Sequence, residues 1–530
     1  MSTQYDADVI VIGSGAIGSN LAYELLKHGK SVIIIESGKW IPRWKIVENF
    51  RSSPRKNNYN DPYPDQPWAP TSYRPGYIEN TGNFQFYPGM LRLVGGTTWH
   101  WAAFTWRLLP NDMKIKTLYG VGRDWPISYE DIEPYYVRAE YNLGVAGSDI
   151  EDQSGQNRNQ PFPPRSKPYP VPPEAETYYY QRIKARLGAN GYHLIHEPNA
   201  RPTQYWDGRP PCSGNNNCMP VCPIGAMYSG DVHARKVKNL GGEIIEDATA
   251  YKLEKGEGGK IVAVHYRSSK GEEHQLTGRY FVVACNGLET PKLLLISDVA
   301  NSSDQVGRNL MDHTGIGLQF IADEPLWPGR GPVEQGGVFN RRDGDFRSQH
   351  AAMKHSLTNI VPNRPVTKYL LSKGIVGPEL DRQIRYMSAR WVDISTMLEV
   401  LPNPTNRIQP SSTRKDALGI PTMTIHYDIE DYIRRAAEVA KSDYAQFVKI
   451  MGGTVIENNT GFQNRDHLMG TVLMGDNAKN SVVNHEGRCW DHPNLFLAST
   501  GVIPACNVVN PTLTGIAVAI RSADIIAREV

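Results

Sequence analysis

The chain has 530 residues, of which 40% are hydrophobic and 21% are charged, so it is long enough for about two to four domains with a large core. Its 57 Lys and Arg residues nearly balance 55 Asp and Glu residues, which leaves a net charge of +2. This balance gives no support to nucleic-acid binding, because that function calls for a basic surface.

The first predicted elements form a strand–helix–strand unit. Residues 8–13 (DVIVIG) and 31–36 (SVIIIE) are short apolar runs, typical of strands buried on both faces in a parallel sheet. Between them, residues 15–28 carry apolar side chains at helical spacing. This order predicts an α/β fold at the N-terminus.

A glycine motif lies at the turn of this unit. The spacing Gly13-x-Gly15-x-x-Gly18 permits a tight turn and a close approach of the backbone to a pyrophosphate, which the helix N-terminus then binds. Glu36 ends the second strand, where a carboxylate accepts hydrogen bonds from a ribose and repels the extra phosphate of NADP. The motif predicts a dinucleotide site but does not separate FAD from NAD, and a plain strand–turn–helix remains the alternative.

Further elements follow along the chain. Residues 40–90 are rich in Pro, Tyr and Asn, which indicates long ordered loops. A helix is expected at about 231–240, and residues 251–268 predict a hairpin with Gly at its turn. Residues 280–287 (YFVVACNG) indicate another buried strand that ends in glycine.

Three cysteines crowd into one short loop. Cys212, Cys218 and Cys222 have the spacing C-x5-C-x3-C, and Pro223 follows. A disulfide would use two thiols and leave one over, whereas structural zinc usually takes four ligands. Three thiolates suit an iron–sulfur cluster with one iron missing, [3Fe–4S], with disulfide, free thiols or zinc as alternatives. The remaining cysteines are expected to be small buried residues: Cys285, Cys489 and Cys506.

Several segments resemble a known family. Those at 94–107 (VGGTTWHWAAFTWR), 284–295, 306–313 (VGRNLMDH) and 510–520 (NPTLTGIAVAI) resemble the glucose–methanol–choline (GMC) oxidoreductases, which are FAD enzymes. VGGTTWHW, GVGRDWPI, CSGNNNCMPVCPIGAMY and DHPNLF are also similar to the FAD-bearing large subunits of bacterial membrane-linked sugar dehydrogenases. Those subunits carry a [3Fe–4S] cluster at the cysteine motif, so the resemblance favours the cluster.

The resemblance also implies further FAD-binding residues. They are Gly95, Gly96, Thr97, His100 and Thr512. In some members of the wider family a histidine in a context like that of His100 is linked covalently to the flavin. A ring that stacks on aromatic neighbours and hydrogen-bonds to the flavin is the commoner expectation.

The same resemblance points to a catalytic pair, His467 in NRDHLMG and Asn510 in NVVNPTLTG. A neutral imidazole accepts the hydroxyl proton of an alcohol near neutral pH, and the amide holds the same oxygen while a hydride leaves. His313 and His492 also lie in family-like segments and are interpreted as structural residues. A helix over 511–520 would direct its positive N-terminus toward the flavin.

The expected architecture is α/β, with α+β character overall. A Rossmann-like FAD-binding domain of GMC type comprises residues 1–315, including the iron–sulfur loop 205–228, and residues 461–530 with the catalytic pair. Residues 316–460 are expected to form a substrate-binding domain, an antiparallel sheet backed by helices.

The resemblance implies an FAD-dependent dehydrogenase for a sugar or sugar-acid hydroxyl. Glucose is the first choice, followed by gluconate, 2-ketogluconate, fructose and sorbitol, and electrons would pass through the [3Fe–4S] cluster to a cytochrome c partner. Two alternatives remain: a GMC oxidase that uses oxygen, and a non-catalytic flavin and iron–sulfur electron carrier. Oxidases need no cysteine cluster, which argues against the first.

Location is an expectation from the resemblance. The sequence shows no signal peptide and no run of 18 apolar residues that would predict a transmembrane helix. The related large subunits are exported by a small chaperone-like subunit with a twin-arginine signal, and they bind a multihaem cytochrome c subunit. The expected location is therefore the periplasm, with membrane association only through a partner and no nucleic-acid partner.

Overall fold

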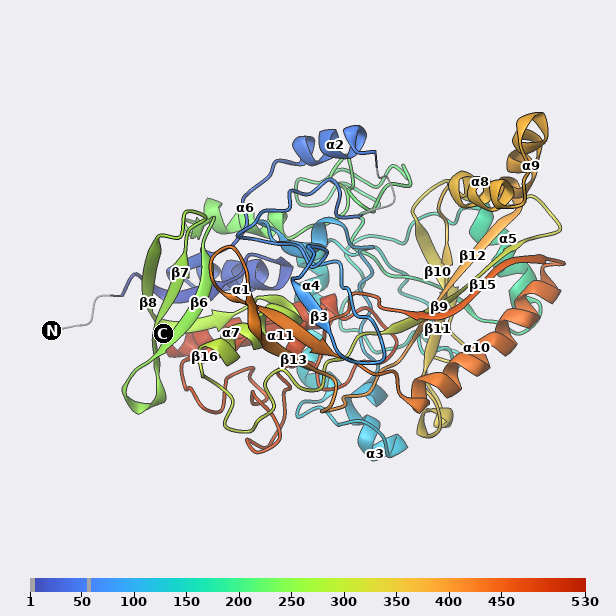
Figure 1. The fold of residues 1–530 in the computed structure, drawn as a ribbon. Coiled ribbons are helices and arrows are strands. Elements are labelled where there is room, and N and C mark those ends of the chain that lie inside the picture. The colour runs from blue at the N-terminus through green and yellow to red at the C-terminus, as the bar shows by residue number, and fades with distance from the viewer. Residues whose placement is uncertain (1–4, 55–58) are drawn as a thin grey trace.

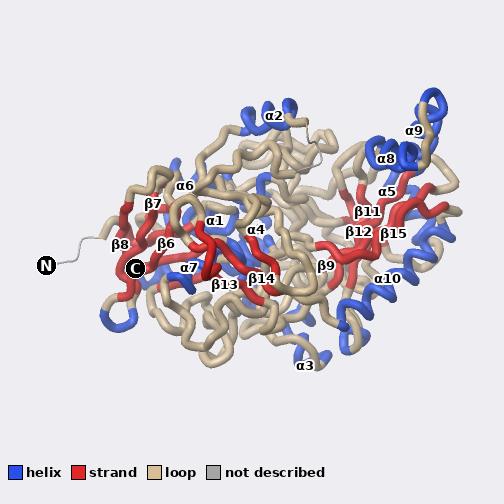
Figure 2. Tube along the Cα trace, viewed as in Figure 1, coloured by secondary structure: helices blue, strands red, loops and turns tan. Residues whose placement is uncertain are grey.

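The computed structural model describes residues 5–54 and 59–530, and its two large sheets lie at opposite ends of the molecule (Figure 1). Long loops connect them, and helices lie next to both (Figure 2). The expected loop region 40–90 also contains a short helix and a short strand, and its residues 55–58 lie outside the described residues.

The first sheet is parallel at its centre. β1 (Ala7–Ile12) pairs with β2 (Val32–Ile35) on one side and with β8 (Glu273–Val283) on the other. β5 (Glu243–Ile245) continues the parallel order beyond β2, and β16 (Leu495–Leu497) pairs in parallel with β8. β1 and β2, at the centre of the sheet, are almost wholly buried, as their continuous apolar runs predict.

Two long helices cover one face of this sheet. α1 (Ala16–Lys27) and α11 (Thr512–Glu529) contribute Leu21, Leu25 and Ile526 to a buried cluster with the side chains of β1 and β2. The predicted strand–helix–strand unit is therefore confirmed to within about one residue at each end, and α11 continues beyond its expected end at residue 520.

β8 differs from its prediction. It begins at Glu273, where it pairs antiparallel with β7 (Ile261–Arg267), and β7 pairs with β6 (Thr249–Lys255) as the predicted hairpin. It ends at Val283 rather than at 287, because the Asn286 side chain accepts backbone hydrogen bonds that start α7 (Asn286–Ile296).

The second sheet is antiparallel throughout. Its strands, in spatial order, are β15 (Thr454–Gln463), β9 (Thr314–Ile321), β12 (Trp391–Leu398), β11 (Met353–Thr358), β10 (Glu334–Val338) and β4 (Leu194–His196). The amphipathic α10 (Asp431–Ile450) lies along this sheet (Figure 1). Its Phe447 packs on His355 of β11. An antiparallel sheet backed by helices is as predicted, although β4 comes from outside 316–460.

The remaining elements connect the two sheets. A small sheet joins β13 (Arg407–Lys415), β14 (Pro421–His426) and β3 (Ile78–Asn80). The other helices are α2 (Arg43–Ser52), α3 (Ile115–Tyr119), α4 (Tyr129–Leu143), α5 (Tyr178–Gly188), α6 (Asp231–Asn239), α8 (Asn363–Ser372) and α9 (Gly377–Arg390). α6 confirms the helix expected at 231–240. The domain boundaries stay a prediction.

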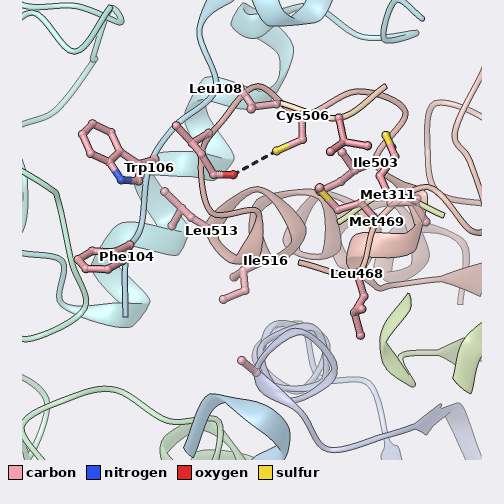
Figure 3. Packing of buried hydrophobic residues seen from close by; sticks show 14 of the residues in the cluster. Phe104, Trp106, Leu108, Met311, Leu468, Met469, Ile503, Cys506, Leu513 and Ile516 are labelled. Atoms are coloured by element: carbon pink, nitrogen blue, oxygen red, sulfur yellow. Dashed lines mark hydrogen bonds between the residues drawn. The ribbon is translucent and has the colours of Figure 1, made fainter. Parts of the chain in front are cut away.

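The start of α11 packs in the core between segments that are distant in the sequence. Leu513 and Ile516 lie near Phe104 and Trp106 on one side and near Met311 and Met469 on the other (Figure 3). Met311 and Met469 exchange two backbone hydrogen bonds of 2.9 Å. This pairing places residues 312–313 beside residues 466–467.

Among residues 5–54 and 59–530, no helix combines the length and the apolar character needed to cross a lipid bilayer.

Candidate active site

A cavity of about 770 Å³ contains residues of both predicted sites. The first sheet and its loops contribute Gly13, Gly15 and Glu36 to its wall. His467 and Asn510 also line it. Residues that are far apart in the sequence therefore line one cavity, which is large enough for an organic cofactor.

The glycine turn leaves room on the cavity side only. A Cβ on Gly18 would lie 2.2 Å from the Gly13 carbonyl oxygen, and a Cβ on Gly13 would lie 2.7 Å from the Ala284 carbonyl oxygen. By contrast, no atom of the described residues lies within 4 Å of a Cβ built on Gly15, which lines the cavity directly before α1 begins at Ala16. The cavity is therefore open beside this helix N-terminus, which suits an anionic group.

A second pair of glycines closes on this turn. The backbone N–H of Gly95 donates to the Ser14 carbonyl oxygen at 3.2 Å, and a Cβ on Gly96 would lie 3.0 Å from the Gly15 Cα. A 3₁₀ turn then runs over Gly96–Trp99 and places Thr97 on the cavity wall. Both glycine motifs singled out in the sequence are therefore neighbours at one place.

His100 and Thr512 also line this cavity. His100 Nε2 is buried and has no hydrogen-bond partner among residues 5–54 and 59–530. Burial lowers the pKa of His100 to about 4, so its ring is neutral. Thr512 is the first residue of α11, whose N-terminus therefore opens on the cavity.

Glu36 makes local contacts that the sequence did not predict. Its Oε2 accepts hydrogen bonds from the backbone N–H of Ser14 at 3.0 Å and from the Ser14 hydroxyl at 2.7 Å. Its Oε1 accepts from the Gly38 N–H at 2.9 Å. The carboxylate thus holds the glycine turn while it lines the cavity, and its contact with a ribose stays a prediction.

His467 lies between two partners. Its Nε2 is 3.0 Å from Asn510 Nδ2, and its Nδ1 is 2.8 Å from His313 Nδ1. On its other side, His313 Nε2 is 2.5 Å from the Asn507 carbonyl oxygen. The structure therefore brings the predicted pair together and adds His313, which its sequence context had indicated to be a structural residue.

This chain of contacts fixes which nitrogen of His467 carries the proton. The Asn507 carbonyl oxygen only accepts, so His313 Nε2 must donate to it. His313 Nδ1 then accepts from His467 Nδ1–H, which leaves His467 Nε2 unprotonated, so that its lone pair accepts from Asn510 Nδ2–H. Burial lowers the pKa of His313 to about 4 and the pKa of His467 well below 6.5, so both rings are neutral.

Asp312 fixes the loop that carries His467. Its carboxylate accepts hydrogen bonds from the backbone N–H groups of Arg465, Asp466 and His467, at 3.0, 3.1 and 2.9 Å. Burial raises the pKa of Asp312 to about 7. Asp466 lines the cavity, and its carboxylate accepts from the Gly89 N–H at 2.9 Å.

His492 serves a different part of the fold. Its Nε2 accepts from the Ala300 N–H at 3.1 Å, and its Nδ1 donates to the Gly259 carbonyl oxygen at 2.6 Å. It does not line the cavity. These contacts agree with its interpretation as a structural residue.

The cysteine loop lies against the cavity wall. Cys218 and Cys222 are buried, Cys212 is half-buried, and Met219 lines the cavity. The Arg201 guanidinium connects the loop to the wall, because its Nη1 lies 3.8 Å from Cys218 Sγ and 2.7 Å from the Ala102 carbonyl oxygen.

The arrangement of these thiols does not form a metal site. All six cysteines are free, so no disulfide joins them. In the part of the chain that the structure describes, no group of three or more His, Cys, Asp or Glu residues is placed to hold a metal ion. Three thiols within one short loop are donor atoms of the kind that iron–sulfur clusters use. Of the other cysteines, Cys489 and Cys506 are buried as predicted, whereas Cys285 is half-buried and lines the cavity.

Two segments, residues 209–315 and 402–519, match the GMC oxidoreductase family. The chain is 42% identical to the fructose dehydrogenase large subunit of Gluconobacter japonicus, over 99% of this chain and 98% of that protein. The chain belongs to the GMC oxidoreductases. This membership confirms the resemblance of the sequence segments.

Other relatives agree. The GMC oxidoreductase is 26% identical to the 2-methyl-1,2-propanediol dehydrogenase of Mycolicibacterium austroafricanum, over 100% of this chain and 96% of that protein. A solved structure of formate oxidase from Aspergillus oryzae superposes with a TM-score of 0.67 at 13% identity, over 99% of this chain and 98% of that one. The fold class predicted from the sequence is confirmed.

As a GMC oxidoreductase, the protein is an FAD-dependent enzyme that oxidises CH–OH donors. The structure fits FAD: Gly15 is open to the cavity at a helix N-terminus, and the buried His100 Nε2 lacks a partner among the described residues. Of the two predicted cofactors, FAD is therefore confirmed, and so is the predicted enzyme class.

The contact between His313 and the catalytic His467 could not be predicted from the sequence. His313 and His467 are 154 residues apart, and no local pattern shows that their rings meet. The only signal was that both lie in family-like segments.

Proposed function

We propose that this GMC oxidoreductase is a dehydrogenase for a hydroxyl group of a sugar or sugar acid. His467 would accept the hydroxyl proton and Asn510 would hold the oxygen. The observation that carries the proposal is the unprotonated Nε2 of His467, which lies beside Asn510 in the cavity.

The residues of the chain divide the reaction into two transfers. The substrate hydroxyl would take the place of the Asn510 amide at His467 Nε2 and donate its proton there, and the released amide N–H would hydrogen-bond to the substrate oxygen. The hydrogen on the carbon leaves with its electron pair, so that the alcohol becomes a carbonyl. When bound, FAD supplies the acceptor for this hydride. His313 keeps the proton on Nδ1 of His467, so that Nε2 is the atom that reacts.

The cavity wall supports a substrate rich in hydroxyl groups. Hydrogen-bonding side chains line it around the catalytic pair: Glu334, Ser356, Thr358, Ser395, Gln463, Asn464 and Arg465. Tyr59, Tyr73 and Tyr87 add aromatic side chains to the same wall. Such a wall favours sugars over apolar alcohols, because apolar substrates would leave buried polar groups unpaired.

An anaerobic substrate screen tests this function. Glucose and fructose are the first substrates to test. The family resemblance of the sequence favours glucose, and a relative at 42% identity is a fructose dehydrogenase large subunit. Gluconate, 2-ketogluconate and sorbitol complete the series. At least one of them is expected to bleach the flavin absorbance, with a carbonyl product.

The same preparation separates the alternatives. Rapid peroxide formation in air would favour the oxidase, and the absence of bleaching by every compound in the series would contradict a sugar dehydrogenase.

We also propose that Cys212, Cys218 and Cys222 hold a [3Fe–4S] cluster, which the spacing of three thiols and the family resemblance support. The native protein is expected to contain iron and to show the paramagnetic resonance signal of oxidised [3Fe–4S]. Cys218→Ser should lose this signal and keep its FAD, whereas Cys489→Ser, a buried cysteine outside the loop, should keep both. Native protein without iron would contradict the cluster.

We further propose a cytochrome c subunit as the electron acceptor, a small chaperone-like subunit and a periplasmic location. These proposals rest on the resemblance to large subunits of sugar dehydrogenases. Copurification of a haem protein with the native enzyme would support them.

A further inference from the structure

A buried lysine lies behind Asn510. Lys354 is part of β11, and neither its side chain nor that of Glu197 has any solvent exposure. Lys354 Nζ donates to Glu197 Oε2 at 3.0 Å and to Asn510 Oδ1 at 3.1 Å. It also lines the cavity, so this ion pair belongs to the wall beside the catalytic pair.

These contacts decide how the Asn510 amide is turned. Its oxygen accepts from Lys354, so its nitrogen is the atom that faces His467 Nε2. A rotated amide would place an oxygen lone pair against the lone pair of Nε2, and this arrangement is repulsive.

Glu197 is itself held firmly. Its Oε1 accepts from the Ser356 hydroxyl at 2.8 Å, and its Oε2 accepts from Trp106 Nε1 at 3.3 Å. Because the carboxylate is fixed by several donors, the lysine that pairs with it has one position.

We propose that Lys354, anchored by Glu197, is a positioning residue for the oxidation: it fixes the Asn510 amide so that its N–H groups serve His467 and the substrate oxygen. This inference rests on the proposed roles of His467 and Asn510. No sequence motif marks Lys354 or Glu197.

The charge of Lys354 also acts on His467. Burial is the main cause of the lowered His467 pKa, and His313, Lys354 and Arg465 lower it further. On the other side, the Asp312 carboxylate binds the backbone N–H of His467, and Asp466 precedes it in the chain. Removing the positive charge at 354 therefore raises the pKa of His467.

The test compares three variants under anaerobic, single-turnover conditions with the best substrate of the screen. Lys354→Met leaves Glu197 without its partner, so Lys354→Met/Glu197→Gln removes both charges and protects the fold. Both are expected to reduce FAD about 10- to 100-fold more slowly, with a smaller change in KM, because a misplaced catalytic group costs rate rather than binding. Lys354→Arg should restore part of the rate.

The pH profile separates positioning from general damage. A base works only when it is unprotonated, so kcat/KM falls at acidic pH as His467 gains a proton. In Lys354→Met this acid limb should move to higher pH. Lys292→Met breaks another ion pair of the cavity wall, with Glu289 at 2.7 Å, and should leave the limb in place, because Lys292 is not among the charges that lower the His467 pKa.

Two outcomes would overturn the proposal: a folded, FAD-loaded double variant with the native rate and the native acid limb, or a Lys292→Met variant that moves the limb equally. Titration of His467 by NMR with labelled histidine, assigned through the signal lost in His467→Ala, needs no substrate. An unchanged His467 pKa in Lys354→Met would therefore count against the lysine alone, whereas a native reduction rate in His467→Ala would count against the proposed function.

Discussion

Replacing His467 with alanine is expected to slow the anaerobic reduction of FAD by sugar at least about 10²-fold, the lower range for the loss of an acid–base group. FAD content should stay unchanged, because the glycine turn and the Gly95–Gly96 segment do not depend on this side chain. Stopped-flow absorbance of the flavin measures the rate, and its spectrum at rest measures the content.

His492→Ala is the control for this variant. His492 is also buried but lies outside the cavity, so its loss should leave the rate within about twofold of native, as for a residue outside the reacting groups. A native rate in His467→Ala would show that His467 is not the base.

The same base sets the expected pH dependence. Because the pKa of His467 lies well below 6.5, the ring stays unprotonated as pH falls through the range in which an ordinary histidine titrates. The value of kcat/KM should therefore hold below pH 6.5 and decrease only at more acidic pH. A decrease in kcat/KM centred on the pKa of an ordinary histidine would contradict the lowered pKa of His467.

The second large effect is expected at Gly15. A methyl group there comes within 4 Å of no atom in the described part of the chain, so the fold should survive Gly15→Ala, but the methyl occupies the cavity at the N-terminus of α1. FAD occupancy is expected to fall about tenfold or more, which corresponds to at least ~1.4 kcal/mol of binding free energy. The ratio of flavin to protein absorbance measures occupancy, and thermal unfolding measures the fold.

Two other glycines provide controls for Gly15→Ala. A Cβ on Gly188 is also free of contacts but lies at the end of α5, outside the cavity, so Gly188→Ala should keep full FAD. A Cβ on Gly18 would press on the Gly13 carbonyl oxygen at 2.2 Å, so Gly18→Ala should damage the turn itself. Full FAD occupancy in Gly15→Ala would show that this helix end does not bind the cofactor.

The parts of the fold that could be predicted are those that local chemistry decides. β1, α1 and β2 followed from apolar runs and glycine spacing, because a buried parallel strand needs an uninterrupted apolar segment. β8 was misplaced at both ends, since its first half pairs with β7 in an exposed hairpin and carries polar residues.

The site divides in the same way. His467 and Asn510 could be named from motifs, and the structure places them 3.0 Å apart. Lys354 and Glu197 could not, because charged residues ordinarily face solvent, and only the tertiary structure shows that these two are buried together. The cysteine loop shows the reverse case. Its motif is clear in the sequence, but among the described residues no group of three or more His, Cys, Asp or Glu side chains is gathered around a metal position.

The position of β16 and α11 has a consequence for biosynthesis. β16 completes the parallel sheet beside β8, and α11 covers β1, yet both follow residue 494. A ribosome therefore delivers the first and last parts of this cofactor site at very different times, and residues 510–512 are the last of the cavity wall to be made. Flavin incorporation should accordingly be a late, post-translational event, and nascent chains stalled before residue 494 should stay colourless.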